Sequence, residues 1–221
     1  MSPVTHGLLS WLLGNAPRDT TRRERVVVTV GGLIPDVDGA GAVPDVLTRA
    51  LGVVPPTQLY SAWHHELHGL PFALVVAGGL GALVPCGRRA RATALVFLAF
   101  HLHLLCDLVG ARGPDGYSWP LPYLAPFSQA VLLEWSGQWA LNAWPNFAIT
   151  GAALAATVVL ALRRGRTFVE CVSLRADAAV VAALRRRLGR GAPSPAPGAE
   201  GSPGPDPTPS PDPTPSEEAA P

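Results

Sequence analysis

Three long apolar runs, separated by short arginine-rich segments, limit what this chain can fold into. The runs cover residues 69–86, 92–111 and 146–162. About twenty apolar residues cross the hydrocarbon core of a bilayer, so each run is predicted to be a transmembrane helix. Two shorter runs, residues 4–16 and 26–35, are predicted to be short helices that are buried or re-entrant and pack against the others. The expected fold is an all-α, polytopic membrane helical bundle.

The composition supports a membrane protein and argues against binding to nucleic acid. Hydrophobic residues make up 48% of the 221 residues and charged residues 15%, whereas soluble domains carry roughly 25% charged residues. The net charge is +1, so no general attraction to nucleic acid follows. The lipid bilayer is therefore the first expected partner.

Three arginine clusters predict how the helices are oriented. Short basic loops favour the cytoplasmic side of a membrane. With all the clusters placed there, the N-terminus lies outside, and every histidine and acidic cluster falls on the outer face, opposite the arginines. The clusters are Arg18, Arg22, Arg23 and Arg25; Arg88, Arg89 and Arg91; and Arg163, Arg164 and Arg166.

Histidine and aspartate are concentrated beside or within the apolar runs, where ionisable groups are functional candidates. His103 and Asp107 are four residues apart in a predicted helix, so their side chains share one face. His101 points about 200° away from His103 around the same helix. His64 and His68 have the same four-residue spacing. Pro35 is expected to end a helix, and in the extended loop after it Asp36 and Asp38 would point the same way.

Imidazole and carboxylate together form a common ligand set for divalent metals. Alternatives exist for single groups: the lone His6 could be a surface histidine, the histidines at 64 to 68 could lie at the membrane interface, and Asp36 and Asp38 could form a turn. Their predicted convergence on one membrane face favours a metal site. Zinc is expected, with manganese and iron as alternatives. The predicted ligands are His6, Asp36, Asp38, His64, His68, His103 and Asp107.

The remaining segments are predicted to surround the membrane domain, residues 1–166. Residues 113–145 carry Trp119, Trp135, Trp139 and Trp144 and are expected to form an interfacial cap on the outer side. Residues 167–190 are too charged to span and are predicted to form a surface helix. Residues 191–221 are rich in proline and serine, without an aromatic residue, and are predicted to be a disordered tail.

The order of these motifs resembles a known family. The motifs are Thr5-His6-Gly7, Leu33-Ile34-Pro35-Asp36-Val37-Asp38, the histidines at 64 to 68, His103-Leu104-Leu105-Cys106-Asp107, Gly110 and Trp119-Pro120. Over residues 4–125 the chain is similar to the LexA-binding, inner membrane-associated hydrolases, also described as membrane-bound metal-dependent hydrolases. The resemblance implies an all-helical protein of the bacterial inner (cytoplasmic) membrane with a metal-dependent hydrolase activity.

The resemblance is incomplete at the second histidine cluster. Many members carry His-Arg-Gly-x-Thr-His, where this chain has His64-His65-Glu66-Leu67-His68. The family's ligand roles therefore do not map onto single histidines here. The motif order is also similar, more loosely, to that of the zinc-dependent phospholipase C group, which implies phosphoester hydrolysis.

The function expected is hydrolysis of a phosphoester or other ester of an amphiphilic substrate by a metal-activated water. Glu66 is the candidate general base, and a solvated surface glutamate is the alternative interpretation. A second hypothesis is a non-enzymatic membrane protein with a structural His/Asp metal site that docks a cytosolic regulator. A third, a proton or metal-ion transporter, ranks last because the inner halves of 69–86 and 92–100 offer no polar path.

Overall fold

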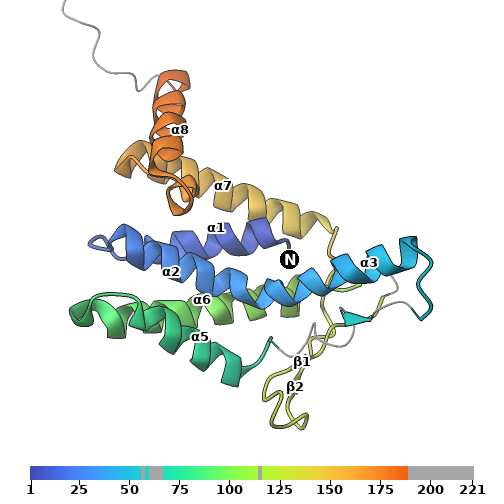
Figure 1. Ribbon diagram of the computed structural model, residues 1–221. Coiled ribbons are helices and arrows are strands. Elements are labelled where there is room, and N and C mark those ends of the chain that lie inside the picture. Colours follow the sequence, from blue (N-terminus) through green and yellow to red (C-terminus); the bar gives the residue numbers. More distant parts are fainter. Residues whose placement is uncertain (56–57, 60–66, 114–115, 189–221) are drawn as a thin grey trace, which may run out of the picture.

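The computed structural model describes residues 1–55, 58–59, 67–113 and 116–188, and these residues are almost entirely helical (Figure 1). The all-α prediction is confirmed. The predicted site residues His64 and Glu66 lie outside the described residues, as do positions 189–190 of the expected surface helix and the expected disordered tail, 191–221.

The first two helices form an antiparallel pair. Helix α1 runs over Pro3–Gly14 and begins with Ser2, whose hydroxyl accepts a hydrogen bond from the Thr5 amide. Helix α2 runs over Arg22–Leu33 and begins with a capping box formed by Thr21 and Glu24, which satisfies backbone N–H groups left open at a helix start. The two helices pack closely along their length.

A single glycine permits this close approach. A Cβ atom on Gly32 would lie 1.8 Å from the hydroxyl oxygen of Ser10, far inside van der Waals contact. Glycine at this position therefore lets the backbone of α2 approach α1. The packing fixes the start of α1 against the end of α2, where the predicted histidine and aspartate motifs lie.

Helix α2 ends at Leu33, next to Pro35, as predicted, but the chain after it stays helical. The 3-10 helix η1, Ile34–Gly41, follows α2 directly and leads into α3, Ala42–Ala50. Pro35 is tolerated because it occupies the first turn of η1, where a missing N–H leaves no bond unmade. Asp36 and Asp38 thus lie on a helical segment, and the expected extended loop is wrong.

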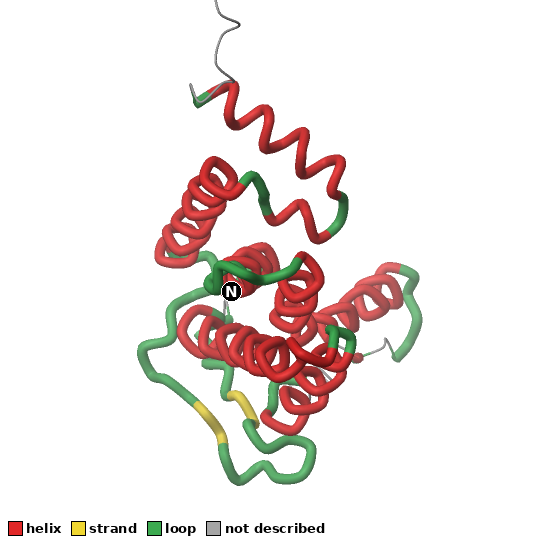
Figure 2. Tube along the Cα trace, turned by 90° about the vertical axis from the view of Figure 1, so that its left-hand side faces the viewer, coloured by secondary structure: helices red, strands yellow, loops and turns green. Residues whose placement is uncertain are grey.

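The next two helices pack against each other, and the second of them lies at the centre of the bundle. Helix α5 covers Leu70–Ala82 and is followed by η2, Cys86–Arg88, and by α6, Arg89–Gly110. Helix α6 packs against both α2 and α5, and Figure 2 shows the packed helices in red. Val28, Val96, Ala99 and Phe100 are fully buried between them.

The C-terminal part covers the other side of α1. Helix α7 spans Trp144–Arg164 and packs against α1. It ends at Gly165 in the left-handed conformation, φ 66°, which glycine adopts without steric cost. The predicted helix over 167–190 is divided into η3, Phe168–Cys171, and α8, Leu174–Arg187, because the Ser173 hydroxyl caps a new helix start.

A two-stranded hairpin, β1 (Leu121–Pro122) with β2 (Leu132–Leu133), lies in the connection from α6 to α7.

Three helical segments of the described chain are long and apolar enough to cross a membrane: Arg22–Ala50, Cys86–Gly110 and Trp144–Arg164. The last two contain most of the predicted spans 92–111 and 146–162. The prediction for 69–86 is wrong in length, because α5 has 13 residues and rises only about 20 Å. The short run 26–35 is instead part of the longest helical segment.

The arginine clusters meet at one end of the bundle. Arg91 forms ion pairs with Asp19 at 2.7 Å and with Glu24 at 2.6 Å, and Arg25 pairs with Glu170 at 2.6 Å. Hydrogen bonds from the Arg91 guanidinium lower the pKa of the exposed Asp19 carboxyl. These contacts join the α1–α2 turn, the start of α6 and η3. By the positive-inside rule this end is expected to face the cytoplasm.

Candidate metal centre

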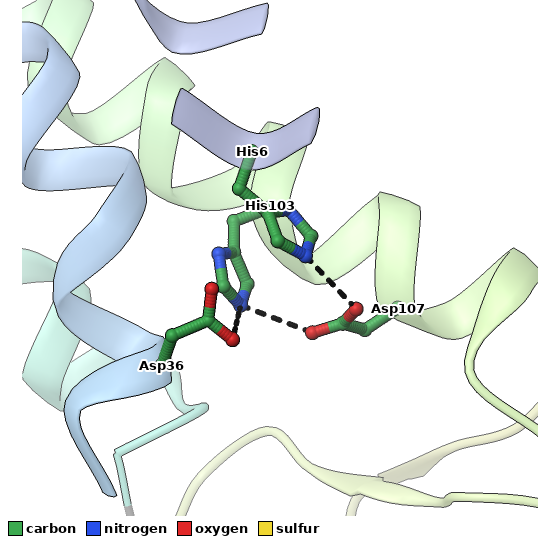
Figure 3. A group of neighbouring side chains, drawn as sticks. All are labelled: His6, Asp36, His103 and Asp107. Carbon is green, nitrogen blue, oxygen red and sulfur yellow. Dashed lines mark ion pairs between the residues drawn. The ribbon is translucent and has the colours of Figure 1, made fainter. Parts of the chain in front are cut away.

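Two histidines and two aspartates converge at the opposite end of the bundle (Figure 3). His6 comes from the first half of α1, Asp36 from η1, and His103 and Asp107 from the last two turns of α6. One ligand atom from each of the four lies within 4.8 Å of all the others. We call these four residues the His/Asp cluster.

His103 is held in the orientation of a metal ligand. Its Nδ1 lies 2.8 Å from the carbonyl oxygen of Gly32. A carbonyl can only accept, so Nδ1 carries the proton and Nε2 presents its lone pair to the cluster. Nε2 lies 3.0 Å from Oδ2 of Asp107 and 3.8 Å from Oδ1 of Asp36. A ring N–H bonded to a backbone carbonyl is the usual way a ligating histidine is oriented.

His6 completes the cluster from the other side. Its ring stacks on that of His103 with 3.8 Å between the ring centroids, and its Nε2 lies 3.2 Å from Oδ1 of Asp107. The side chain is almost wholly buried, yet neither ring nitrogen is within hydrogen-bonding geometry of a described partner. Buried polar atoms without a hydrogen bond are costly, and a shared cation would satisfy the nitrogen that faces Asp107.

Asp38 and His68 extend the cluster. His68 Nδ1 lies 3.1 Å from Oδ2 of Asp38, and its Nε2 lies 3.8 Å from Oδ2 of Asp107. His68 precedes α5 in the chain, and its ring centroid is 5.4 Å from that of His103. Both His68 and Asp38 are buried. Asp107 therefore faces His6 through one oxygen and both His103 and His68 through the other.

The structure thus brings together most of the predicted ligands from four separate stretches of chain: His6, Asp36, Asp38, His68, His103 and Asp107. An extended loop would make Asp36 and Asp38 point the same way, but they do not. Asp36 approaches His103, and Asp38 approaches His68. His101 lies apart from the cluster, as its helical position predicts, with hydrogen bonds to the Phe97 carbonyl and the Tyr123 hydroxyl.

The charge at this site favours a bound cation. Within the described residues, Asp36 and Asp107 form no ion pair with an arginine. Their ionic contacts are with histidines and, for Asp107, with the amino group of Met1. Carboxylates in an interior setting are normally paired or coordinate a metal. Nitrogen and oxygen donors in this mixture fit zinc, manganese or iron.

A cavity of about 1000 Å³ opens beside the cluster. Asp36, His68 and Asp107 form part of its wall, and Trp119, Leu121 and Phe147 contribute apolar surface. This volume is at the upper end of the range for sites that bind small molecules. The cavity therefore gives a ligand direct access to the carboxylates.

Two polar side chains that sequence reasoning missed attach the α6–α7 connection to the site. Gln138 donates to the carbonyl of Asp107 at 3.0 Å and accepts from the Trp119 amide at 3.0 Å. Asn146 donates to the carbonyl of Gly110 at 2.9 Å and accepts from the Trp139 indole at 2.8 Å. No local pattern marks either residue, because each role depends on contacts far along the chain. Trp139 is thus hydrogen-bonded within the cap that was predicted only to be interfacial.

Searches of curated proteins and of solved structures find no significant match to the chain. The family described as YdjM inner membrane protein matches residues 1–186, a range that holds the cluster, the cavity wall and all three candidate membrane spans. The chain therefore belongs to the YdjM inner membrane protein family and is a multi-pass protein of the inner membrane.

Proposed function

We propose that the protein is a membrane-bound metal-dependent hydrolase that cleaves a phosphoester or other ester of an amphiphilic substrate. The observation that supports this most is the convergence of His6, Asp36, His103 and Asp107 within 4.8 Å beside a cavity. The resemblance to metal-dependent hydrolases, drawn from the motif order, supports the same reading.

The residues of the cluster fit a divalent cation. His103 offers Nε2, since its Nδ1 proton is engaged by Gly32, and His6 offers the ring nitrogen that faces Asp107. Asp36 and Asp107 would supply oxygen ligands, and His68 with Asp38 would hold a second cation. A divalent cation supplies Lewis acidity, which polarises an ester and makes water a better nucleophile near neutral pH.

The protein side chains supply binding and proton transfer. A substrate bound in the cavity would present its scissile group to Asp36 and Asp107, and the apolar wall would exclude water from the rest of the substrate. Phe147 and Leu141 line the cavity and are exposed, so an apolar chain can extend from the cavity into the bilayer. Glu66 is proposed as the general base on its sequence position two residues before His68.

The metal proposal is tested by purifying the protein in detergent and measuring bound zinc, manganese and iron by plasma mass spectrometry. His103→Ala and Asp107→Ala should lose the metal. His101→Ala is the matched control, because it lies on the same helix with its ring outside the cluster. Unchanged metal content in both cluster variants would refute the site.

Catalysis is tested separately with a panel of chromogenic phosphomonoesters, phosphodiesters and carboxylic esters. Turnover should require the added metal and should be lost in Asp107→Ala and reduced in Glu66→Gln. Metal binding without turnover on any member of the panel would exclude the hydrolase and favour the second candidate.

The second candidate is a structural metal site in a non-enzymatic protein that docks a cytosolic regulator. The cluster joins α1, η1 and α6, so a cation there would cross-link three segments. At the other end of the bundle α8 carries Arg185, Arg186 and Arg187 in its last turn, which offers a basic surface to an acidic partner. This candidate predicts that chelation lowers the thermal stability while no ester is hydrolysed.

A further inference from the structure

Arg112 lies on the wall of the cavity that adjoins the His/Asp cluster. It follows the end of α6 by two residues and is thus five residues beyond Asp107. Its backbone is fixed on both sides, because its N–H donates to the carbonyl of Trp139 at 3.1 Å and its carbonyl accepts from Leu141 at 3.1 Å. The arginine is therefore a rigidly placed part of the cavity.

The guanidinium of Arg112 is held in place but is not neutralised. Its Nη2 donates to the carbonyl of Ser136 at 2.7 Å. Its Nε is buried and has no hydrogen-bond partner, and in the described part of the chain no carboxylate lies within ion-pair distance of the group. A guanidinium has five N–H donors, and the donors on Nη1 and Nη2 that Ser136 does not use have no partner among the described residues, so they can bind an anion.

Arg112 also differs from the arginine clusters in location. Those clusters lie at the end of the bundle expected to face the cytoplasm, where Arg25 and Arg91 are paired with carboxylates. Arg112 lies at the opposite end, beside Asp36 and Asp107, and pairs with neither. An arginine placed among carboxylates without pairing with them is suited to a ligand that brings its own negative charge.

The chemistry of the cavity wall defines that ligand. Arginine binds phosphate-type oxyanions through two parallel N–H donors, and a cation in the cluster would attract the same anion from the other side. Trp119, Leu121, Leu141 and Phe147 supply apolar surface around this polar end. A ligand with an anionic headgroup and an apolar chain would match this polar end and the apolar surface around it.

We propose that Arg112 is the anion-recognising residue of the cavity and that its ligand is an amphiphile with a phosphate-type headgroup. The assignment of this ligand as a substrate rests on the proposed hydrolase function; its binding does not. Arg112 acts on affinity and orientation by donating hydrogen bonds to the anionic oxygens, while the metal ligands remain those of the cluster.

The test is calorimetric binding to the full chain in detergent, loaded with zinc, of three probes: inorganic phosphate, dihexanoyl phosphatidate and dihexanoylglycerol. The wild-type protein should bind the phosphatidate, and Arg112→Gln should bind it at least about tenfold more weakly, as expected for loss of one charge-assisted pair. Arg112→Lys, which keeps the charge but not the two parallel donors, should be intermediate. Binding of dihexanoylglycerol should be the same in all variants.

Arg49→Gln is the matched control, because Arg49 is an exposed arginine of α3 and does not line the cavity. It should bind all probes as the wild type does. Equal affinity of Arg112→Gln and wild type for the phosphatidate would overturn the proposal. If the wild type binds inorganic phosphate and the phosphatidate equally well, the ligand is free phosphate and the proposed amphiphilic ligand is wrong. About tenfold tighter binding of the phosphatidate would support an amphiphilic ligand.

Bound metal is measured in the same samples, so that failure of the hydrolase proposal can be distinguished from failure of the proposed role of Arg112. Arg112→Gln should retain the wild-type metal content, which shows that the cluster is intact. If the wild type binds no metal, the hydrolase proposal fails, while the difference between wild type and Arg112→Gln in phosphatidate binding still decides the role of Arg112.

Discussion

Asp107 and His103 lie one helical turn apart on α6, with Oδ2 of the aspartate 3.0 Å from Nε2 of the histidine. The other oxygen of Asp107 faces His6, and His68, in the segment before α5, approaches Oδ2. Asp107 is thus the residue that connects the ligands of different helices, and its removal should affect the proposed centre more than removal of any single histidine.

Asp107→Asn tests this role with little change in volume. The amide keeps the shape of the side chain but removes the charge, so metal affinity should fall by more than the roughly 10–100-fold typical of changes to residues that only orient a ligand. Competition with a chromogenic zinc chelator measures the dissociation constant. His101→Ala on the same helix should leave that constant unchanged, and a similar loss in both variants would point to general damage of α6.

Gly32→Ala should damage the centre without touching a ligand. The added Cβ would lie 1.8 Å from Ser10 Oγ and 2.7 Å from Ser10 Cβ, so α1 and α2 must separate, and His6 and the carbonyl that orients His103 would move. We expect loss of bound metal and a lower melting temperature. Adding Ser10→Gly should restore both in part.

Gly78→Ala is the matched control for this change. Gly78 is also a helical glycine, but a Cβ there would meet nothing within 4 Å, and alanine favours the helix by about 1 kcal/mol. Its metal content should equal that of the wild type. Wild-type metal content in Gly32→Ala would show that close packing of α1 on α2 does not position the ligands.

The buried pair of Arg25 and Glu170 should contribute to stability but not to metal binding. Two nitrogens of Arg25 donate to the two oxygens of Glu170, each at 2.6 Å, and Trp11 donates to the same carboxylate at 3.0 Å. Glu170→Ala leaves a buried guanidinium unpaired, which costs about 3–5 kcal/mol and should lower the melting temperature by on the order of 10 °C.

Intrinsic fluorescence during heating in detergent measures this effect, and metal analysis of the same sample should give the wild-type value. The double variant Arg25→Met, Glu170→Leu removes both charges and should regain most of the stability, because an apolar pair of similar size can replace a buried ion pair. A double variant as unstable as Glu170→Ala would mean that lost packing, and not the unpaired charge, causes the effect.

Acidification should release the metal. Imidazoles bind cations only when deprotonated, and an unperturbed histidine titrates near pH 6.5. The stabilisation by bound metal should therefore be full above neutral pH and should disappear as the pH falls below about 6. The measurement is the melting temperature with zinc minus that with a chelator, between pH 5 and pH 8. A difference that does not change with pH would exclude histidine ligands.

Cys86 reports the orientation in the membrane. It is an exposed free cysteine beside Arg88 and Arg89 at the arginine end of the bundle, whereas Cys106 is buried. Cys171 is also free and half-buried, so the test uses a Cys171→Ser background. There a membrane-impermeant maleimide should label Cys86 in inverted vesicles and not in intact spheroplasts, and Cys86→Ser should abolish the signal. Labelling in intact spheroplasts would place the arginine clusters outside.

Local rules of the sequence determined the helices and part of the site. Helical periodicity placed His103 and Asp107 on one face and turned His101 away, because residues four apart face the same side whatever surrounds the helix. The same rules did not predict correctly where some helices begin and end. The segment after Pro35, predicted to be an extended loop, is the 3-10 helix η1, and the apolar run 69–86 forms an α-helix only over Leu70–Ala82.

What only the tertiary structure decided is the set of contacts between distant segments. The proximity of Asp36 to His103 and of His6 to Asp107 depends on how α1, α2 and α6 pack, and this depends on side-chain shape at positions such as Gly32 and Ser10. The cavity, and an Arg112 guanidinium that pairs with no carboxylate of the described residues, arise in the same way. Helix formation is governed by neighbours in sequence, whereas a shared ligand sphere is governed by packing between helices, which no local pattern encodes.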